Sequence, residues 1–305
     1  MTEFGQYMGN QSNSLPAALN FGYLGKQSDK ILRHLRSVPS GLLSRMYARW
    51  CQENNFGDAL SPWLLKKITG VMPFNIELSK FIEYSQTISR KPDFVVIGSI
   101  LQWCGKHSVI WGTGFISQDS LLTNKPWRVL AVRGALTRSK LLEQGVDCPK
   151  IYGDPALLIP RFWKPVIEKK YDLGLIPHYV DKAHEFVQKA RKISSVLVID
   201  VQQEPEKVIC DILSCEKIAS SSLHGIVVAD AYNIPSLWVK LSNKIVGHDF
   251  KFRDYFSSVG DNKREAYFVT EATTIKNIMA MVNVRELRIN LNQLWAACPF
   301  KSQKC

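Results

Sequence analysis

From residue 93 onward, short apolar runs alternate with segments whose leucines follow helical spacing. The apolar runs predict buried strands at 93–98, 108–112 and 128–132. Leucines spaced along 134–145, followed by Gly145, predict a helix with its C-terminal stop. Strand, loop and helix in turn are typical of βα units on a parallel sheet.

The same alternation resumes after a break at 155–165, where three prolines in eleven residues predict an irregular segment. Beyond it, the pattern predicts strands at 172–176, 196–199, 217–219 and 235–239, and helices at 182–192, 206–213, 223–232 and 273–295. We therefore predict an α/β fold with two Rossmann-like domains that face a central cleft. The expected divisions are a polar tail at 1–22, an N-terminal domain at 23–163 and a C-terminal domain at 164–305, with the terminal helix packing back on the N-terminal domain.

A basic segment, 26–50, precedes the first of these units. It carries six Lys and Arg residues against the single acid Asp29, and Leu42, Met46 and Trp50 recur every four residues. This spacing predicts two short basic amphipathic helices around a break at Pro39. Two interpretations stay open: a solvated face that packs its apolar side on the domain, or a surface that lies on anionic lipid.

Composition narrows the class of protein. With 305 residues, of which 46% are hydrophobic and 22% charged, the chain is neither fibrous nor of low complexity, and it can bury a core. It shows neither a signal-like start nor an apolar stretch of membrane-spanning length, and its seven cysteines lack CxxC spacing. We expect a cytoplasmic protein with reduced, buried thiols and no metal site.

The net charge of +12 indicates attraction to polyanions, anionic lipid or a phosphorylated small molecule. No nucleic-acid recognition motif accompanies it, so we expect no nucleic-acid partner. There is also no Gly-x-Gly-x-x-Gly fingerprint, so dinucleotide binding is not supported.

Four polar positions follow predicted strands, where open α/β sheets bind ligands. Arg133 follows the strand at 128–132 and opens a helix, a place that suits an anion and equally suits a surface ion pair. His224 follows Ser220, Ser221 and Ser222 and lies in the first turn of the next helix, where the dipole favours a neutral imidazole. One serine is expected to be a helix cap, and a lone histidine is more often structural.

The other two positions are carboxylates in turns. Asp58, within Asn54–Leu60, is either a helix cap or a base that is presented to the cleft. Asp154 follows Gly153 in a turn and can simply bind its own backbone. None of the four positions is specific alone.

The joint order of these segments is more specific. NFGDAL at 55–60, AVRGALTRSKLLEQG at 131–145, YGDPALLIP at 152–160, IPH at 176–178, SSSLHGIVVADAYNIP at 220–235 and KFRDYF at 251–256 resemble the polysaccharide pyruvyl transferase family, of the bacterial exopolysaccharide type. The resemblance covers about two thirds of the chain. It implies a GT-B-like fold and an enzyme that moves the pyruvyl group of phosphoenolpyruvate onto two hydroxyls of a sugar as a ketal.

The resemblance also implies residue roles. The donor site of the family maps onto Arg133, Leu223 and His224, but Ser222 stands where many members have arginine. The missing cation is then expected from Arg138, His178, Lys240 or Arg253. We predict His224 and Asp58 as catalytic residues, and the predicted substrate-binding residues are Arg133, Ser221, Ser222, Leu223, Asn55, His178 and Arg253.

The expected donor is phosphoenolpyruvate, with no cofactor, and the expected acceptor is a lipid-linked or polymeric saccharide at the inner face of the membrane, with peripheral contact to anionic lipid. Phosphoenolpyruvate is a small trianion, which explains the demand for fixed positive charge and helix N-termini. A GT-B glycosyltransferase that uses a nucleotide sugar is the main alternative. A silent binding protein for anionic polysaccharide is a third interpretation, which Ser222 favours.

Overall fold

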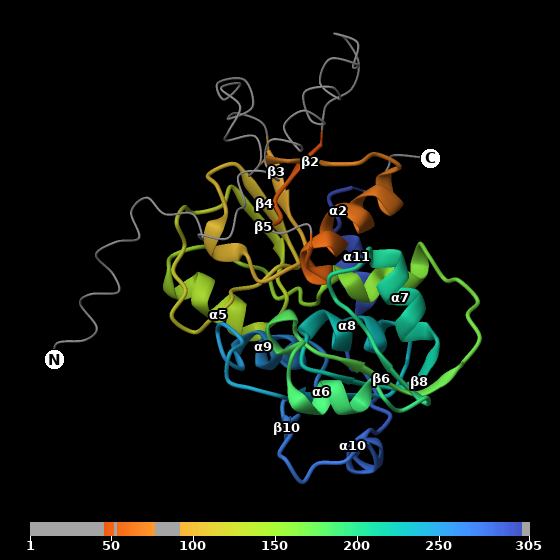
Figure 1. The fold of residues 1–305 in the computed structure, drawn as a ribbon. Coiled ribbons are helices and arrows are strands. Elements are labelled where there is room, and N and C mark those ends of the chain that lie inside the picture. Colours follow the sequence, from red (N-terminus) through yellow and green to blue (C-terminus); the bar gives the residue numbers. More distant parts are fainter. Residues whose placement is uncertain (1–45, 52–53, 77–91, 301–305) are drawn as a thin grey trace, which may run out of the picture. The chain divides into compact units, whose positions relative to one another are not determined.

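The computed structural model describes residues 46–51, 54–76 and 92–300 of the chain (Figure 1). All of these residues belong to one compact unit, which spans Arg45–Cys305. The described part is α/β and contains two five-stranded sheets, in which every pair of neighbouring strands is parallel. The predicted α/β class with parallel sheets is therefore confirmed.

The first sheet has the strand order β2-β1-β3-β4-β5. Its strands are β1 (Tyr47–Ala48), β2 (Phe74–Asn75), β3 (Asp93–Val95), β4 (Ser108–Trp111) and β5 (Arg128–Ala131). The last three lie where the apolar runs predict them. The first two, of two residues each, were not predicted.

The second sheet has the order β10-β9-β8-β6-β7. Its strands are β6 (Tyr171–Ile176), β7 (Val196–Val198), β8 (Cys215–Ser220), β9 (Ser236–Lys240) and β10 (Tyr267–Phe268). Counted along the chain within each half, both sheets have the doubly wound order 2-1-3-4-5. In this order the connections diverge between the first and third strands, and ligands bind in the crevice beyond the carboxyl ends of those strands.

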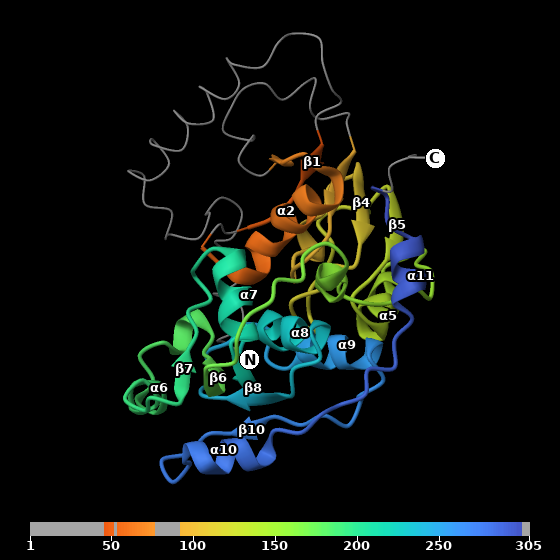
Figure 2. The ribbon, with the colours of Figure 1, turned by 90° about the vertical axis from the view of Figure 1, so that its right-hand side faces the viewer.

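Helices lie between and around the sheets. The longer ones are α2 (Phe56–Thr69), α5 (Ala135–Glu143), α7 (Pro205–Leu213), α8 (Leu223–Ala231) and α9 (Phe250–Ser258). Shorter helices are α6 (Glu185–Ala190) and the 3-10 helices η1 (Leu101–Trp103), η2 (Pro155–Arg161) and η3 (Tyr179–Asp181). Two views at right angles both place α8 and α9 between the sheets (Figures 1 and 2). The helices predicted at 134–145, 182–192, 206–213 and 223–232 are confirmed.

One hydrophobic core joins the two halves. It combines Phe56 and Leu60 of α2 and Trp111 of β4 with Ile226 of α8 and Trp238 of β9. The proline-rich stretch is part of this core, because 155–161 forms η2 and its Ala156–Ile159 stretch is buried. The expectation of an irregular segment is thus wrong: Pro155 starts a helix without losing a needed N–H, and Asp154 caps it. The domain boundary placed there stays a prediction.

The C-terminal region differs from the single long helix predicted at 273–295. It forms two short helices, α10 (Ile275–Met281) and α11 (Leu291–Ala296), separated by a stretch whose Arg288 N–H binds the Val259 carbonyl at 2.9 Å. That stretch contacts the C-terminal end of α9, and the helix of α10 does not continue through it. The α11 helix packs on η2, and its Leu294 carbonyl accepts a hydrogen bond from Trp111 Nε1 at 3.1 Å.

The described end of the basic segment corrects another expectation. Residues 46–50 include strand β1 in place of a helix, and Trp50 is 5% exposed within the core. Arg49 pairs with Asp93 at 2.5 Å. Trp50 therefore serves packing and cannot lie among lipid headgroups; residues 26–45 lie outside the described part of the chain.

In the described part of the chain, no helix has both the length and the apolar character needed to cross a bilayer. None of the six cysteines described there is part of a disulfide. Cys51 is exposed, contrary to the expectation of buried thiols, whereas Cys104, Cys148, Cys215 and Cys298 are buried.

Candidate functional site

The turn between β8 and α8 is held by its own serines. Ser220 Oγ donates to the Ser222 carbonyl at 2.8 Å and accepts from the Ser222 N–H at 3.0 Å. Ser221 Oγ accepts from the His178 N–H at 2.8 Å, which ties the carboxyl end of β6 to that of β8. Ser222 is the N-cap residue of α8, as one serine was expected to be, but its side chain makes no capping hydrogen bond. The N-terminus of α8 thus lies at the crevice of the second sheet without a side-chain cap.

His224, in the first turn of α8, faces Asp154. Its Nε2 lies 3.3 Å from Asp154 Oδ2, and both side chains are nearly sealed, at 10% and 1% exposure. The contact is not aligned as a hydrogen bond, so these two buried atoms have no hydrogen-bond partner. Asp154 Oδ1 accepts from the Ala156 N–H at 2.9 Å, as the turn predicts. The contact with His224, seventy residues along the chain, was not predicted.

The N-terminus of α2 meets α8 at His224. A β-carbon at Gly57 would lie 2.2 Å from His224 Nδ1, so only glycine permits this approach. Asn55 is the N-cap, and its side chain accepts from the Gly57 N–H at 3.1 Å. The cap of α2 is therefore Asn55 and not Asp58, and the predicted contact of Asn55 with substrate stays a prediction.

Asp58 lies beside the carboxyl end of β3. It is 8% exposed, and a β-carbon at Gly98 would be 3.4 Å from its Oδ1. His178, at the end of β6, is half-buried, and burial together with the nearby Lys251 lowers its pKa from 6.5 to about 4. Its imidazole is neutral at physiological pH, with Nδ1 accepting from the Val180 N–H at 3.4 Å.

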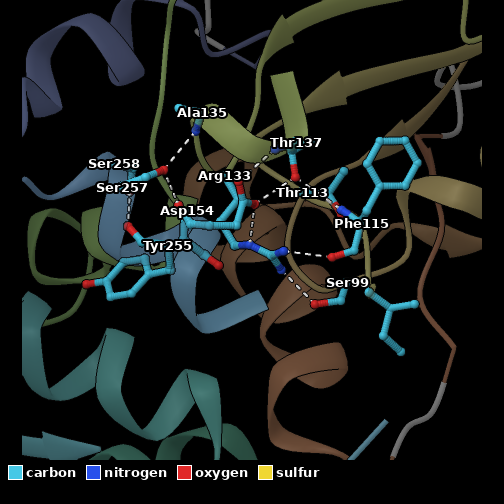
Figure 3. Close-up of polar contacts among 12 residues, drawn as sticks. Ser99, Thr113, Phe115, Arg133, Ala135, Thr137, Asp154, Tyr255, Ser257 and Ser258 are labelled. Atoms are coloured by element: carbon cyan, nitrogen blue, oxygen red, sulfur yellow. Dashed lines mark hydrogen bonds and ion pairs between the residues drawn. The ribbon is translucent and has the colours of Figure 1, made fainter. Parts of the chain in front are cut away.

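Arg133 is sealed within the protein. Its side chain is 0% exposed; Nε donates to Asp254 Oδ2 at 2.9 Å, and the guanidinium also binds Ser99 Oγ at 2.6 Å and the Phe115 carbonyl at 2.7 Å (Figure 3). A substrate contact requires an accessible guanidinium, whereas this one is sealed and paired with Asp254 of α9. A contact of Arg133 with the donor stays a prediction.

Three other candidate cations are also engaged. Arg138 Nε donates to the Cys148 carbonyl at 3.0 Å, and Lys240 pairs with Asp249. Arg253 binds Glu265 through both terminal nitrogens, at 2.8 and 2.6 Å. None of them adds an unpaired charge near Ser222, and neutral His178 adds none either.

Lys251, in the first turn of α9, is a cation that the sequence reasoning missed. Burial, and then the charge of Arg133, lowers its pKa from 10.5 to about 8, while Asp58 opposes the shift. Its ammonium makes neither a hydrogen bond nor an ion pair with any residue described here. The sequence could have indicated it, because Lys251 is the first residue of the KFRDYF segment that resembles the family.

The observed contacts link His224 to Asp154 and Gly57, and Lys251 interacts electrostatically with Asp58, Arg133 and His178. His224 with Asp154 can hold and deliver a proton, Asp58 can accept one, and Lys251 and the two helix N-termini suit a phosphate or carboxylate. Leu223 is 3% exposed and packs in the core, so only its backbone N–H can serve a ligand. Within residues 46–51, 54–76 and 92–300, no cluster of His, Cys, Asp and Glu could hold a metal ion.

The chain is similar to one known protein family and to two known proteins. The family model for "Polysaccharide pyruvyl transferase" matches residues 55–243. The chain is 32% identical to "Uncharacterized protein L143" of Acanthamoeba polyphaga mimivirus over 238 residues, 74% of this chain and 78% of that protein. It is 27% identical to "Succinoglycan biosynthesis protein ExoV" of Rhizobium meliloti (strain 1021) over 219 residues, which span 68% of this chain and 63% of that protein. No solved structure matches.

Proposed function

Because this chain belongs to the polysaccharide pyruvyl transferase family, we propose that it transfers the pyruvyl group of phosphoenolpyruvate to two hydroxyls of a sugar, as a ketal, in exopolysaccharide or capsule biosynthesis. The observation that carries the proposal is the meeting of α2 and α8 at the His224–Asp154 pair. Asp58, Asp154, His178 and His224 all fall within the matched residues 55–243.

In this proposal the donor lies at the carboxyl ends of β6 and β8, against the N-terminus of α8. A small trianion gains there from unpaired N–H groups and from the positive end of the helix dipole. The shared 2-1-3-4-5 order of the two sheets supports a GT-B-like arrangement of Rossmann-like halves, with the donor on the C-terminal side and the acceptor on the N-terminal side.

His224 is proposed as the acid. The Asp154 carboxylate, 3.3 Å from Nε2, stabilises the imidazolium form of His224, which then delivers a proton to the substrate. That proton is transferred to C3 of phosphoenolpyruvate, which becomes a methyl group while C2 becomes electrophilic. Ser222, next to Leu223 and His224 in the chain, carries no charge, and its hydroxyl makes no hydrogen bond to a described residue.

Asp58 is proposed as the base. It accepts the proton of the first sugar hydroxyl as that oxygen bonds to C2; the C2–O bond to phosphate then breaks, and phosphate leaves with the electron pair. The second hydroxyl adds to C2 in the same way. The two sugar hydroxyls thus lose two protons. One restores the proton that His224 gave to C3, and the other leaves with phosphate, so the reaction balances without a redox cofactor.

The acceptor is proposed to be a lipid-linked or polymeric saccharide, met at the inner face of the membrane. The basic segment 26–50 gives such an enzyme a means of contact with anionic lipid through its charges. The apolar residues Met46 and Trp50 do not take part in that contact, because they pack on the core.

The test is incubation of the purified chain with carbon-labelled phosphoenolpyruvate and a panel of lipid-linked oligosaccharides. We expect phosphate release and transfer of label in equal amounts, with an acid-labile ketal in the product. Phosphate release without label in the saccharide, or neither event with any acceptor, would contradict the proposal. Turnover of a nucleotide sugar by the same preparation would favour the glycosyltransferase alternative.

A further inference from the structure

The proposed donor carries three negative charges, yet among the described residues the N-terminus of α8 offers no cation besides the proposed His224 imidazolium, which faces Asp154. Ser222 is neutral, and His178 is uncharged at physiological pH. Arg133, Lys240 and Arg253 each face a carboxylate of the protein. A phosphorylated ligand bound there needs compensating charge from another element.

The helix α9 is held against the N-terminus of α5 and against Arg133, which precedes it. Asp254 accepts from Arg133 Nε at 2.9 Å, from the Thr137 N–H at 2.8 Å and from Thr137 Oγ1 at 2.7 Å. Lys251 lies three residues before Asp254, and residues spaced by three share one face of a helix. Its position relative to the first sheet is therefore fixed by the same contacts.

The titratable neighbours of Lys251 come from three elements in both halves. They are Asp58 of α2, Arg133 after β5 and His178 after β6. Its chain is half-buried, and its nitrogen lies 5.8 Å from the centre of the adjoining Phe252 ring. An ammonium that lacks a hydrogen-bond or ion-pair partner at such a place is costly unless a ligand supplies one.

We propose that Lys251 binds the phosphate group of phosphoenolpyruvate, and that it is the cation that Ser222 and the sealed Arg133 do not provide. This inference rests on the proposed function. A compact ammonium on a flexible stem suits phosphate as a point charge, without the planar geometry that guanidinium demands. When the C2–O bond breaks, the same contact stabilises the charge that collects on the leaving phosphate.

The first test measures phosphoenolpyruvate binding by calorimetry for the parent, Lys251→Gln, Lys251→Arg and a matched control, Lys263→Gln. Lys263 is exposed beyond α9 and loses the same charge. We expect affinity to fall about 10- to 100-fold in Lys251→Gln, the loss of one charge-assisted contact, with partial recovery in Lys251→Arg and no change in the control. Inorganic phosphate should lose affinity in parallel, whereas pyruvate should not.

The second test needs no substitution, so it holds even if a variant fails to fold. The parent is acetylated briefly near neutral pH with and without phosphoenolpyruvate, and each lysine is read by peptide mass spectrometry. We expect phosphoenolpyruvate and inorganic phosphate to protect Lys251 but not Lys263. Equal labelling of Lys251 with and without phosphoenolpyruvate would overturn the proposal.

The outcomes separate the two claims. If the parent neither binds nor turns over phosphoenolpyruvate, the proposed function itself fails. If the parent is active and a folded Lys251→Gln binds the donor as well as the parent does, the function stands and the role of Lys251 fails. If pyruvate and phosphate lose affinity equally, Lys251 does not recognise the phosphate, which also contradicts the proposal.

Discussion

Two helix N-termini follow strands at the carboxyl edges of the two sheets, and they are used differently. At α5, the carboxylate of Asp254 binds Arg133 and the Thr137 N–H, and Ser257 Oγ accepts from the Ala135 N–H at 2.9 Å (Figure 3). At α8, Ser222 makes no side-chain cap. One positive helix end is thus satisfied by the protein's own carboxylate, and the other is the end at which we propose that an external anion binds.

Close packing against a glycine occurs at both helix N-termini, but with different partners. A β-carbon at Gly134 would lie 1.8 Å from the Asp254 carbonyl, so α9 presses directly on the start of α5. At α8, the ring of His224 presses on Gly57, and its neighbour Asp154 retains an oxygen without a hydrogen bond. Similar sequence signals, a residue able to bind anions beside a glycine and a helix start, therefore mark a buried tether in one half and the His224–Asp154 contact in the other.

We call the N-terminus of α5, with Arg133 and Asp254, the sealed end and the N-terminus of α8 the open end. The comparison between them is tested most strongly at the sealed end. Arg133→Met leaves Asp254 buried without its counter-ion, so we expect the free energy of unfolding to fall by about 3–5 kcal/mol in urea titrations. The matched control is Arg253→Met on α9, the helix of Asp254. Its pair with Glu265 is exposed, so its loss should cost no more than about 1 kcal/mol. Equal losses for the two variants would mean that the buried tether is not special.

At the open end, His224→Gln should act on rate. Removing a general acid typically lowers turnover by a hundredfold to ten-thousandfold, so we expect a loss of about that size in kcat with a nearly unchanged melting temperature. The control is His107→Gln, an exposed histidine in the first half. Near-normal turnover by a folded His224→Gln protein would remove the imidazole from the mechanism.

Most of the fold could be predicted because local pattern decides it. Apolar runs such as those of β4 and β6 are long enough to identify buried strands, and the glycine after 134–144 marks a helix end. Contacts between segments that are distant in the sequence decide the remaining elements. Tyr47–Ala48 is a strand because it lies between β2 and β3, and the stretch after Met281 leaves the helix because Arg288 binds the end of α9.

The candidate site was predictable only in part. Its place beyond the strands of an α/β fold, and His224 and Asp58 within it, follow from residue type and position. The partners do not: Asp254 lies 121 residues after Arg133, and nothing local indicates that it seals the guanidinium. Lys251 was hidden by its own segment, where Arg253 has the same charge but faces Glu265.

A pH profile sharpens the open end. Lys251 has a pKa lowered to about 8, so its ammonium is charged below that pH and is lost above it. If only the charged form binds, phosphoenolpyruvate affinity should be about tenfold weaker at pH 9 than at pH 7. Neither His178, neutral throughout this range, nor the charges of Asp58 and Arg133 should contribute to the slope. Calorimetry of Lys251→Arg should give a flat profile; a parallel decline would assign the titration to another group.

The smallest expected effect comes from making the open end resemble the sealed one. Ser222→Asp places a carboxylate at the N-cap of α8, where Asp254 stands for α5. Helix dipole and charge then favour the folded state by about 0.3–1 kcal/mol, while like-charge repulsion should weaken phosphoenolpyruvate binding several-fold. Ser139→Asp, on the exposed side of α5, is the control for added charge. Thermal unfolding and calorimetry read the two effects, and they should move in opposite directions, because a helix end that already holds its own anion has less to offer a ligand. A variant that gains no stability and binds the donor as the parent does would show that the N-terminus of α8 is not the anion site.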